Sequence, residues 1–133
     1  MELEDFVAVS GLPGIFKINT SRNNGLVVDD IDTGKSKFCS VRKHQFTPLG
    51  TVAIYTLSDT VELKEVFKKM KEKASIVPII ETSASKEDLE AYFREIIPDY
   101  DEDRVYVSDM KKVLKWYAFL DKRNLLDSTG EEE

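Results

Sequence analysis

Three aspartates, Asp99, Asp101 and Asp103, alternate with other residues between two segments of helical periodicity. Oxygen ligands at the first, third and fifth positions of a loop between two helices are what an EF-hand offers to calcium. The remaining positions fit poorly, because Arg104 replaces the turn glycine and Met110 replaces the bidentate glutamate. The alternative is a solvated acidic turn in which one aspartate pairs with Arg104. We therefore expect no bound metal, and the three aspartates are the candidate ligands if calcium or a small ligand binds.

The single cysteine and the single histidine, Cys39 and His44, are close in sequence and have basic neighbours at Lys37, Arg42 and Lys43. A thiolate beside an imidazole is the pair that nucleophilic catalysis uses. Nothing in the sequence orients the histidine, and the alternative places the cysteine inside a strand and the histidine on a polar loop. The chain also lacks a glycine-rich phosphate loop and the G-x-S-x-G, H-E-x-x-H and C-x-x-C motifs. We therefore expect a protein that is not an enzyme and has no cofactor.

The last helical segment carries the residues that we expect to form an interaction surface. It is basic on one side, and its aromatic side chains extend beyond its apolar stripe. A helix that is apolar around much of its girth is either deeply buried or exposed for a partner. Protein contacts are therefore the leading hypothesis, and nucleic acid is an alternative because the third helix is the reader in helix-turn-helix proteins. The expected surface consists of Lys111, Lys112, Lys115, Trp116 and Phe119.

Length, charge and cysteine content limit these functions. The 133 residues suffice for one domain or two small ones. The net charge of −6 disfavours nucleic acid, because phosphate binding needs a basic face. One cysteine cannot form an internal disulfide, which fits a reducing compartment. The acidic residues 1–5 are unlike a signal peptide, and no apolar run approaches the roughly 20 residues of a membrane span. We expect a soluble cytoplasmic protein with no membrane partner.

The first part of the chain predicts short strands separated by tight turns. Pro13-Gly14 predicts a turn with a positive φ at Gly14. Asn24-Gly25 between two strand-like runs predicts a hairpin, and residues 32–35 predict a further tight turn. Five strands are expected, near residues 6–9, 16–19, 26–31, 36–41 and 51–57.

The second part predicts three amphipathic helices, at residues 59–74, 85–97 and 108–120, with Asp59, Ser85 and Ser108 as N-caps. The predicted fold class is α+β. A small SH3-like β-barrel or a five-stranded antiparallel meander, residues 1–57, precedes a three-helix unit, residues 58–121. Residues 122–133 are expected to form a flexible acidic tail.

Four segments together resemble an uncharacterised family of small proteins found chiefly in Bacteroidetes. They are SGLPGIFK at 10–17, NGLVV at 24–28, LKEVF at 63–67 and PDYDEDRVYVSDMKK at 98–112. The resemblance covers about residues 3–120. It implies a bacterial cytoplasmic protein with an N-terminal β domain and a C-terminal helical domain. It implies no activity, cofactor or catalytic residue.

Overall fold

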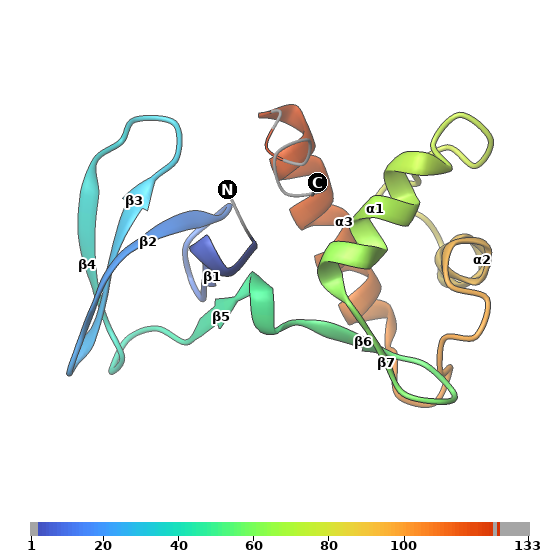
Figure 1. Cartoon of the computed structure of the whole chain (residues 1–133), viewed down its shortest axis with the longest axis horizontal. Coiled ribbons are helices and arrows are strands. Elements are labelled where there is room, and N and C mark those ends of the chain that lie inside the picture. The colour runs from blue at the N-terminus through green and yellow to red at the C-terminus, as the bar shows by residue number, and fades with distance from the viewer. Residues whose placement is uncertain (1–2, 124, 126–133) are drawn as a thin grey trace. The chain divides into compact units, whose positions relative to one another are not determined.

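The structure is a computed structural model that describes residues 3–123 and 125 (Figure 1). The chain divides into two structural units, Met1–Val52 and Ala53–Glu133. This division falls five residues before the boundary expected after residue 57. Strand β6 (Ala53–Tyr55) pairs with β7 (Thr60–Glu62) and not with the sheet of the first unit. Residues 124 and 126–133 of the expected acidic tail lie outside the described residues.

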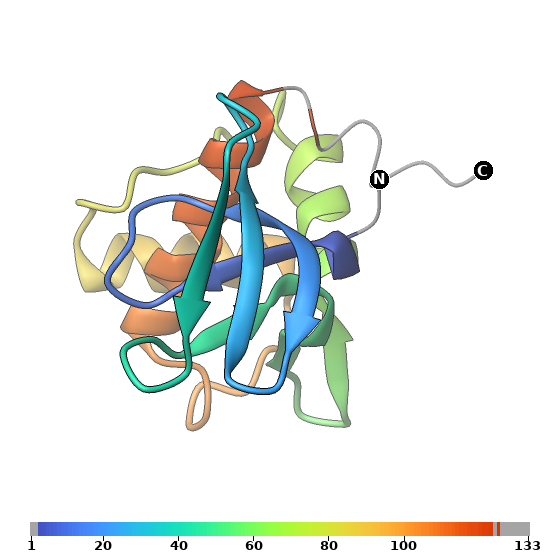
Figure 2. The ribbon, with the colours of Figure 1, turned by 90° about the vertical axis from the view of Figure 1, so that its left-hand side faces the viewer.

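An open antiparallel sheet forms the first unit, with its strands in the order β4-β3-β2-β1-β5. Strands β1 to β4 are a meander, and Figure 2 shows β2, β3 and β4 side by side. The predicted five-stranded meander is confirmed, although its fifth strand is not the segment at 51–57. The SH3-like barrel is corrected: within the described residues β4 pairs only with β3 and β5 only with β1, so the sheet does not close. The strands are β1 (Phe6–Val9), β2 (Phe16–Arg22), β3 (Gly25–Asp30), β4 (Ser36–Ser40) and β5 (Phe46–Pro48), with 3-10 turns η1 (Leu3–Asp5) and η2 (Leu49–Thr51).

Glycines shape the turns of this sheet. Gly14 has a φ of 80° and Gly34 a φ of 76°, as the predicted turns require. The β2–β3 hairpin is confirmed, but Arg22 pairs with Gly25, so the two turn residues are the asparagines that precede the glycine. A Cβ at Gly25 would collide with the carbonyl oxygen of Cys39 and would lie 2.9 Å from Cζ of Phe38. Close approach of β4 therefore explains this glycine.

A hydrophobic cluster of the first unit lies on one face of the sheet. Its buried side chains come from β1, β3 and β4. Successive side chains of a strand point to opposite faces, so Val7 and Val9 of β1 lie on the same one. Cys39 is also among the buried side chains and is 1% exposed. The cluster consists of Val7, Val9, Val28 and Cys39, with Leu12, Phe16, Ile18, Leu26 and Phe46 packed against it.

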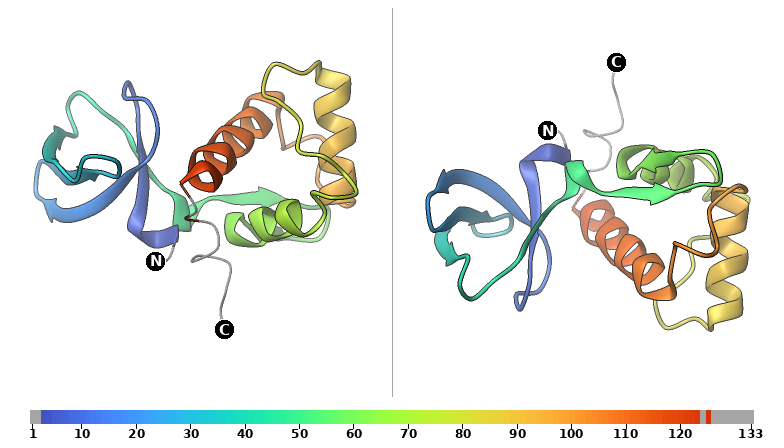
Figure 3. Two further views of the ribbon diagram at one scale, coloured as in Figure 1. Left: turned by 90° about the horizontal axis from the view of Figure 1, so that it is seen from above. Right: turned by 90° about the horizontal axis from the view of Figure 1, so that it is seen from below.

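The second unit combines the β6–β7 hairpin with helices α1 (Leu63–Glu72), α2 (Lys86–Ile96) and α3 (Val107–Lys122), as Figure 3 shows. The predicted apolar stripes are buried, and the rings of Phe67 and Tyr117 meet edge to face at 5.8 Å. None of the helices among the described residues is long and apolar enough to cross a membrane. The buried stripes are Leu63, Val66, Phe67 and Met70; Leu89, Tyr92, Phe93 and Ile96; and Met110, Val113, Leu114, Tyr117 and Leu120.

One of the three predicted N-caps is confirmed. The backbone N–H of Asp88 donates to Ser85 Oγ over 3.2 Å at the start of α2. Asp59 does not cap α1, because residues 60–62 are strand β7 and the helix begins at Leu63. Ser108 does not cap α3 either: the helix begins one residue earlier, and the carboxylate of Asp109 accepts the backbone N–H of Tyr106 over 2.9 Å.

Candidate functional site

The aspartate loop between α2 and α3 lies along the β6–β7 hairpin as a third extended segment. Thr56 and Tyr100 form an antiparallel bridge. On either side of it, the backbone N–H groups of Leu57 and Asp101 donate across to carbonyl oxygens, each over 2.9 Å. Thr56 and Tyr100 point inward and are 3% and 4% exposed. Backbone pairing therefore fixes the position of a loop that was expected to be a simple solvated turn.

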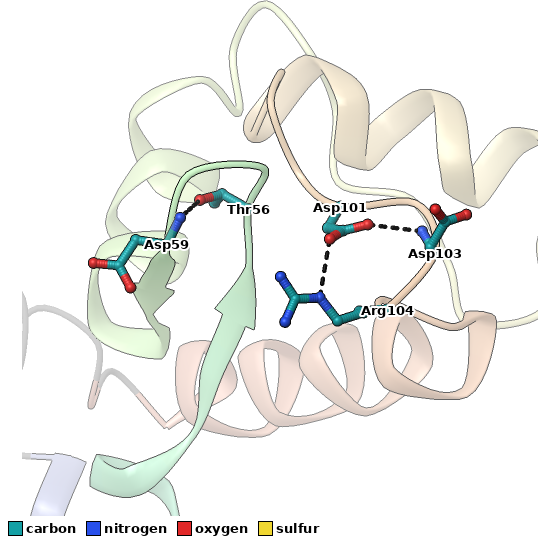
Figure 4. A network of polar contacts seen from close by, with 5 residues as sticks. All are labelled: Thr56, Asp59, Asp101, Asp103 and Arg104. Atoms are coloured by element: carbon teal, nitrogen blue, oxygen red, sulfur yellow. Dashed lines mark hydrogen bonds and ion pairs between the residues drawn. The ribbon is translucent and has the colours of Figure 1, made fainter.

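The carboxylate of Asp101 is occupied by contacts within this loop (Figure 4). Its Oδ2 accepts Nε of Arg104 over 3.0 Å, and its Oδ1 accepts the backbone N–H of Asp103 over 3.0 Å. The hydrogen bond from Arg104, followed by the one from Asp103, lowers the pKa of Asp101 from its ordinary value. This confirms the predicted pairing of one aspartate with Arg104. Among the described residues, no group of three His, Cys, Asp or Glu side chains is placed to hold a metal ion.

Arg104 also stacks on an aromatic ring of the hairpin. Its guanidinium carbon lies 4.5 Å from the ring centroid of Tyr55. Because Thr56 points inward, its neighbours Tyr55 and Leu57 share the outer face, where they are 44% and 75% exposed. We call the outer face formed by Tyr55, Leu57, Arg104 and Asp101 the tip surface.

Acidic side chains dominate the surroundings of the tip surface. The hairpin turn and the loop carry five carboxylates and one arginine, and Arg94 of α2 reaches the loop. Arg94 donates to Glu102 over 2.7 Å, and its guanidinium carbon lies 5.9 Å from the ring centroid of Tyr100. The two arginines leave a net excess of negative charge. The carboxylates are Asp59, Asp99, Asp101, Glu102 and Asp103.

Two buried tyrosine hydroxyls, those of Tyr92 and Tyr100, have no hydrogen-bond partner among the described residues. Burial, with a smaller contribution from Tyr117, raises the pKa of Tyr92 to about 12. Burial likewise raises the pKa of Tyr100. Both shifts favour the neutral phenol over the phenolate.

The surface predicted on α3 is distinct from the tip surface. Its three lysines are exposed, whereas Trp116 and Phe119 are half-buried. The guanidinium carbon of Arg123 lies 3.6 Å from the ring centroid of Phe119 and covers part of that ring. The interaction surface at Lys111, Lys112, Lys115, Trp116 and Phe119 stays a prediction.

The tip surface was missed in the sequence, although a signal for it existed. Alternation along residues 53–57 places Ile54 and Thr56 on one face and Tyr55 and Leu57 on the other. Ile54 is 4% exposed, so the inward face could be assigned from its apolar side chain. The stacking arginine has no such signal, because its position depends on the pairing of the loop with the hairpin.

Cys39 and His44 do not form the nucleophilic pair considered above. Cys39 is a free cysteine in the core of the first unit. Nδ1 of His44 lies 2.8 Å from the carbonyl oxygen of Ser10, to which it donates in the Nδ1–H tautomer. The structure confirms the alternative interpretation, with a buried strand cysteine and a histidine on a loop.

The fold defines a small α+β protein with an antiparallel β unit followed by a helical unit. Residues 52–120 match a family model described as a domain of unknown function (DUF6852), and residues 3–49 match a second described as a domain of unknown function (DUF5606). The first match spans half of the chain, and the protein belongs to the DUF6852 family.

A solved structure supports this assignment. The chain is similar to a protein from Bacteroides vulgatus whose solution NMR structure was determined as a structural genomics target. The two are 32% identical, with a TM-score of 0.74 over 92% of this chain and 88% of that chain. A comparison with curated proteins found no match. The predicted resemblance to a family with a β domain and a helical domain is confirmed.

Proposed function

We propose that the protein is a non-enzymatic binding or adaptor protein that acts through contacts with other proteins. The tip surface carries this proposal. Tyr55 and Leu57 are exposed, and Arg104 is held by two contacts. The backbone of Tyr55 pairs with β7 and with the loop, and the backbone N–H of Leu57 is bound by Asp99. Side chains that are ordered before binding lose less conformational entropy when a partner covers them. Tyrosine and arginine are also enriched among residues that dominate binding energies.

We place this function in the cytoplasm. The single cysteine rules out an internal disulfide, and the buried position of Cys39 agrees with a chain that keeps its thiol reduced. The nucleic-acid alternative rests on the exposed lysines of α3, Lys111, Lys112 and Lys115. The net charge of −6 opposes it, because a polyanion is repelled by an acidic protein.

The test is a pull-down from a lysate of the native host with the tagged full-length protein, with and without nuclease. We expect a defined protein that is retained in stoichiometric amounts after nuclease treatment. Loss of the partner on nuclease treatment would favour the nucleic-acid alternative. Absence of any specific partner would contradict the proposal.

Two matched variants test whether the captured partner binds the tip surface. Leu57→Ser removes an aliphatic side chain from the tip surface, and Ile76→Ser removes one that is 81% exposed on the connection between α1 and α2. Capture should fall with the first variant and persist with the second.

A further inference from the structure

We propose that the tip surface binds an extended segment of a partner protein in which lysine or arginine alternates with apolar side chains. This inference rests on the proposed function and names the chemistry of the partner. Three properties of the surface carry it: its exposed apolar side chains, the charge of the neighbouring loop and turn, and the spacing of the two apolar residues along the backbone.

The apolar part consists of Tyr55 and Leu57. Leu57 is 75% exposed although its backbone N–H is hydrogen-bonded to the carbonyl oxygen of Asp99. Its side chain therefore has little part in packing of the fold, while its backbone is held by the loop. When a partner covers an apolar side chain that is exposed to water in this way, the free energy of the complex is lowered. A complementary segment must present apolar side chains of its own.

The charge around these side chains selects a basic segment. Asp101 is neutralised by Arg104, and Glu102 by Arg94. The exposed carboxylates of Asp59, Asp99 and Asp103 have no basic partner among the described residues. Unpaired carboxylates beside an apolar patch attract lysine or arginine and repel acidic segments.

The spacing favours an extended segment over a helix. Tyr55 is the last residue of β6, and Leu57 follows the bridge of Thr56 with Tyr100; extended backbone across this bridge separates the two side chains by about 7 Å. Alternate side chains of an extended partner have the same separation, so they can meet both residues in register. The intervening side chains of the partner then point away from the apolar pair. Lysine and arginine side chains are long and flexible enough to turn toward carboxylates of the loop and of the hairpin turn.

The chain itself contains a segment with related chemistry. Strand β4 and the residues after it expose Phe38 and Val41, 47% and 55% exposed, between Lys37 and Arg42. A second copy of the chain is therefore the competing occupant. Phe38 also covers Gly25, which accounts for its place in the fold. Self-association would depend on protein concentration and would be abolished by Phe38→Ser. Sedimentation of the full-length wild type and of this variant measures the oligomeric state.

The experiment is selection of a random peptide library displayed on phage against the full-length protein, followed by affinity measurement on synthetic copies of the selected peptides. We expect selected peptides to combine lysine or arginine with leucine or aromatic residues. Leu57→Ser should weaken their binding about tenfold, as expected for an exposed contact residue. Asp99→Asn combined with Asp103→Asn should weaken binding and reduce its dependence on salt. Ile76→Ser should leave binding unchanged.

Several outcomes would overturn the inference: no selected peptides, peptides without basic residues, binding insensitive to Leu57→Ser, or a concentration-dependent dimer that Phe38→Ser removes. The substituted residues are exposed, and circular dichroism of each variant shows whether the fold is retained. The proposed function can fail separately. A partner that survives nuclease but binds Leu57→Ser normally would support protein binding and reject this surface. If peptides bind the tip surface but no cellular partner is found, the proposed function is rejected and the inference that the tip surface binds such peptides is retained.

Discussion

Arg104 lies over the ring of Tyr55, with its guanidinium carbon 4.5 Å from the ring centroid. One residue belongs to the loop before α3 and the other to strand β6, so the contact joins two segments that are distant in sequence. The Nε of Arg104 is meanwhile bound by Asp101. The arginine thus occupies a carboxylate of the aspartate loop and covers a ring of the hairpin, which joins the two parts of the tip surface.

This contact should contribute measurably to stability. In a double-mutant cycle of Tyr55→Ala and Arg104→Ala, we expect a coupling free energy of about 0.5 kcal/mol, because the pair is partly exposed to solvent. Urea unfolding of the wild type, both single variants and the double variant gives this value. Tyr55→Ala combined with Lys115→Ala is the control and should be additive, since Lys115 lies on α3. Additivity in both cycles would show that the stacked arrangement contributes nothing.

Asp101 should make stability depend on pH in a defined direction. Its pKa in the folded protein lies below the ordinary value of 3.8, chiefly because of the hydrogen bond from Arg104. Such a carboxyl group stabilises the fold above its ordinary pKa, and that contribution is lost as pH falls through the lowered folded value. Asp101→Asn should therefore be less stable than wild type at neutral pH, and the difference should shrink as the pH falls below the ordinary pKa of 3.8. A difference that stays constant across a series of urea titrations would contradict this.

Two serines near helix starts differ in whether they cap the helix. Ser85 accepts the backbone N–H of Asp88, whereas Ser108 lies inside α3. Ser85→Ala should lower the free energy of unfolding by about 1 kcal/mol, the usual effect of losing a cap. Ser108→Ala should leave it unchanged or raise it slightly, because alanine is the better helix former. Equal losses in the two variants, measured by thermal unfolding, would mean that α3 starts at Ser108 in solution.

Local patterns in the sequence predicted much of this fold. The buried positions of α1, Leu63, Val66, Phe67 and Met70, follow the helical period and need no knowledge of the rest of the chain. The positive φ of Gly14 and Gly34 follows from turn chemistry in the same way. These features depend on neighbours in sequence, which is why periodicity and turn residues suffice.

The pairing of segments that are distant in sequence could not be predicted in this way. Residues 51–57 read as extended, but their partners are β7 on one side and the loop around Tyr100 on the other. The choice between these partners and the first sheet depends on which segments are near in space. The candidate site depends on the same pairing, because Tyr55 and Arg104 meet only when the loop lies along β6. The spacing of the aspartates identified the loop in the sequence, but it did not identify the tip surface beside it.

Gly25 of β3 lies where β4 approaches the backbone closely, and substitution of this glycine tests that contact. A Cβ at this position would collide with the carbonyl oxygen of Cys39 and would lie 2.9 Å from Cζ of Phe38. Gly25→Ala should therefore lower the free energy of unfolding by about 1–3 kcal/mol, as overpacking does in a rigid interior. Adding Phe38→Ala removes the ring but leaves the backbone oxygen in place, so the double variant should recover little of the loss. Full recovery in the double variant, measured by urea unfolding against Phe38→Ala alone, would identify the ring and not the β4 backbone as the reason for glycine at this position.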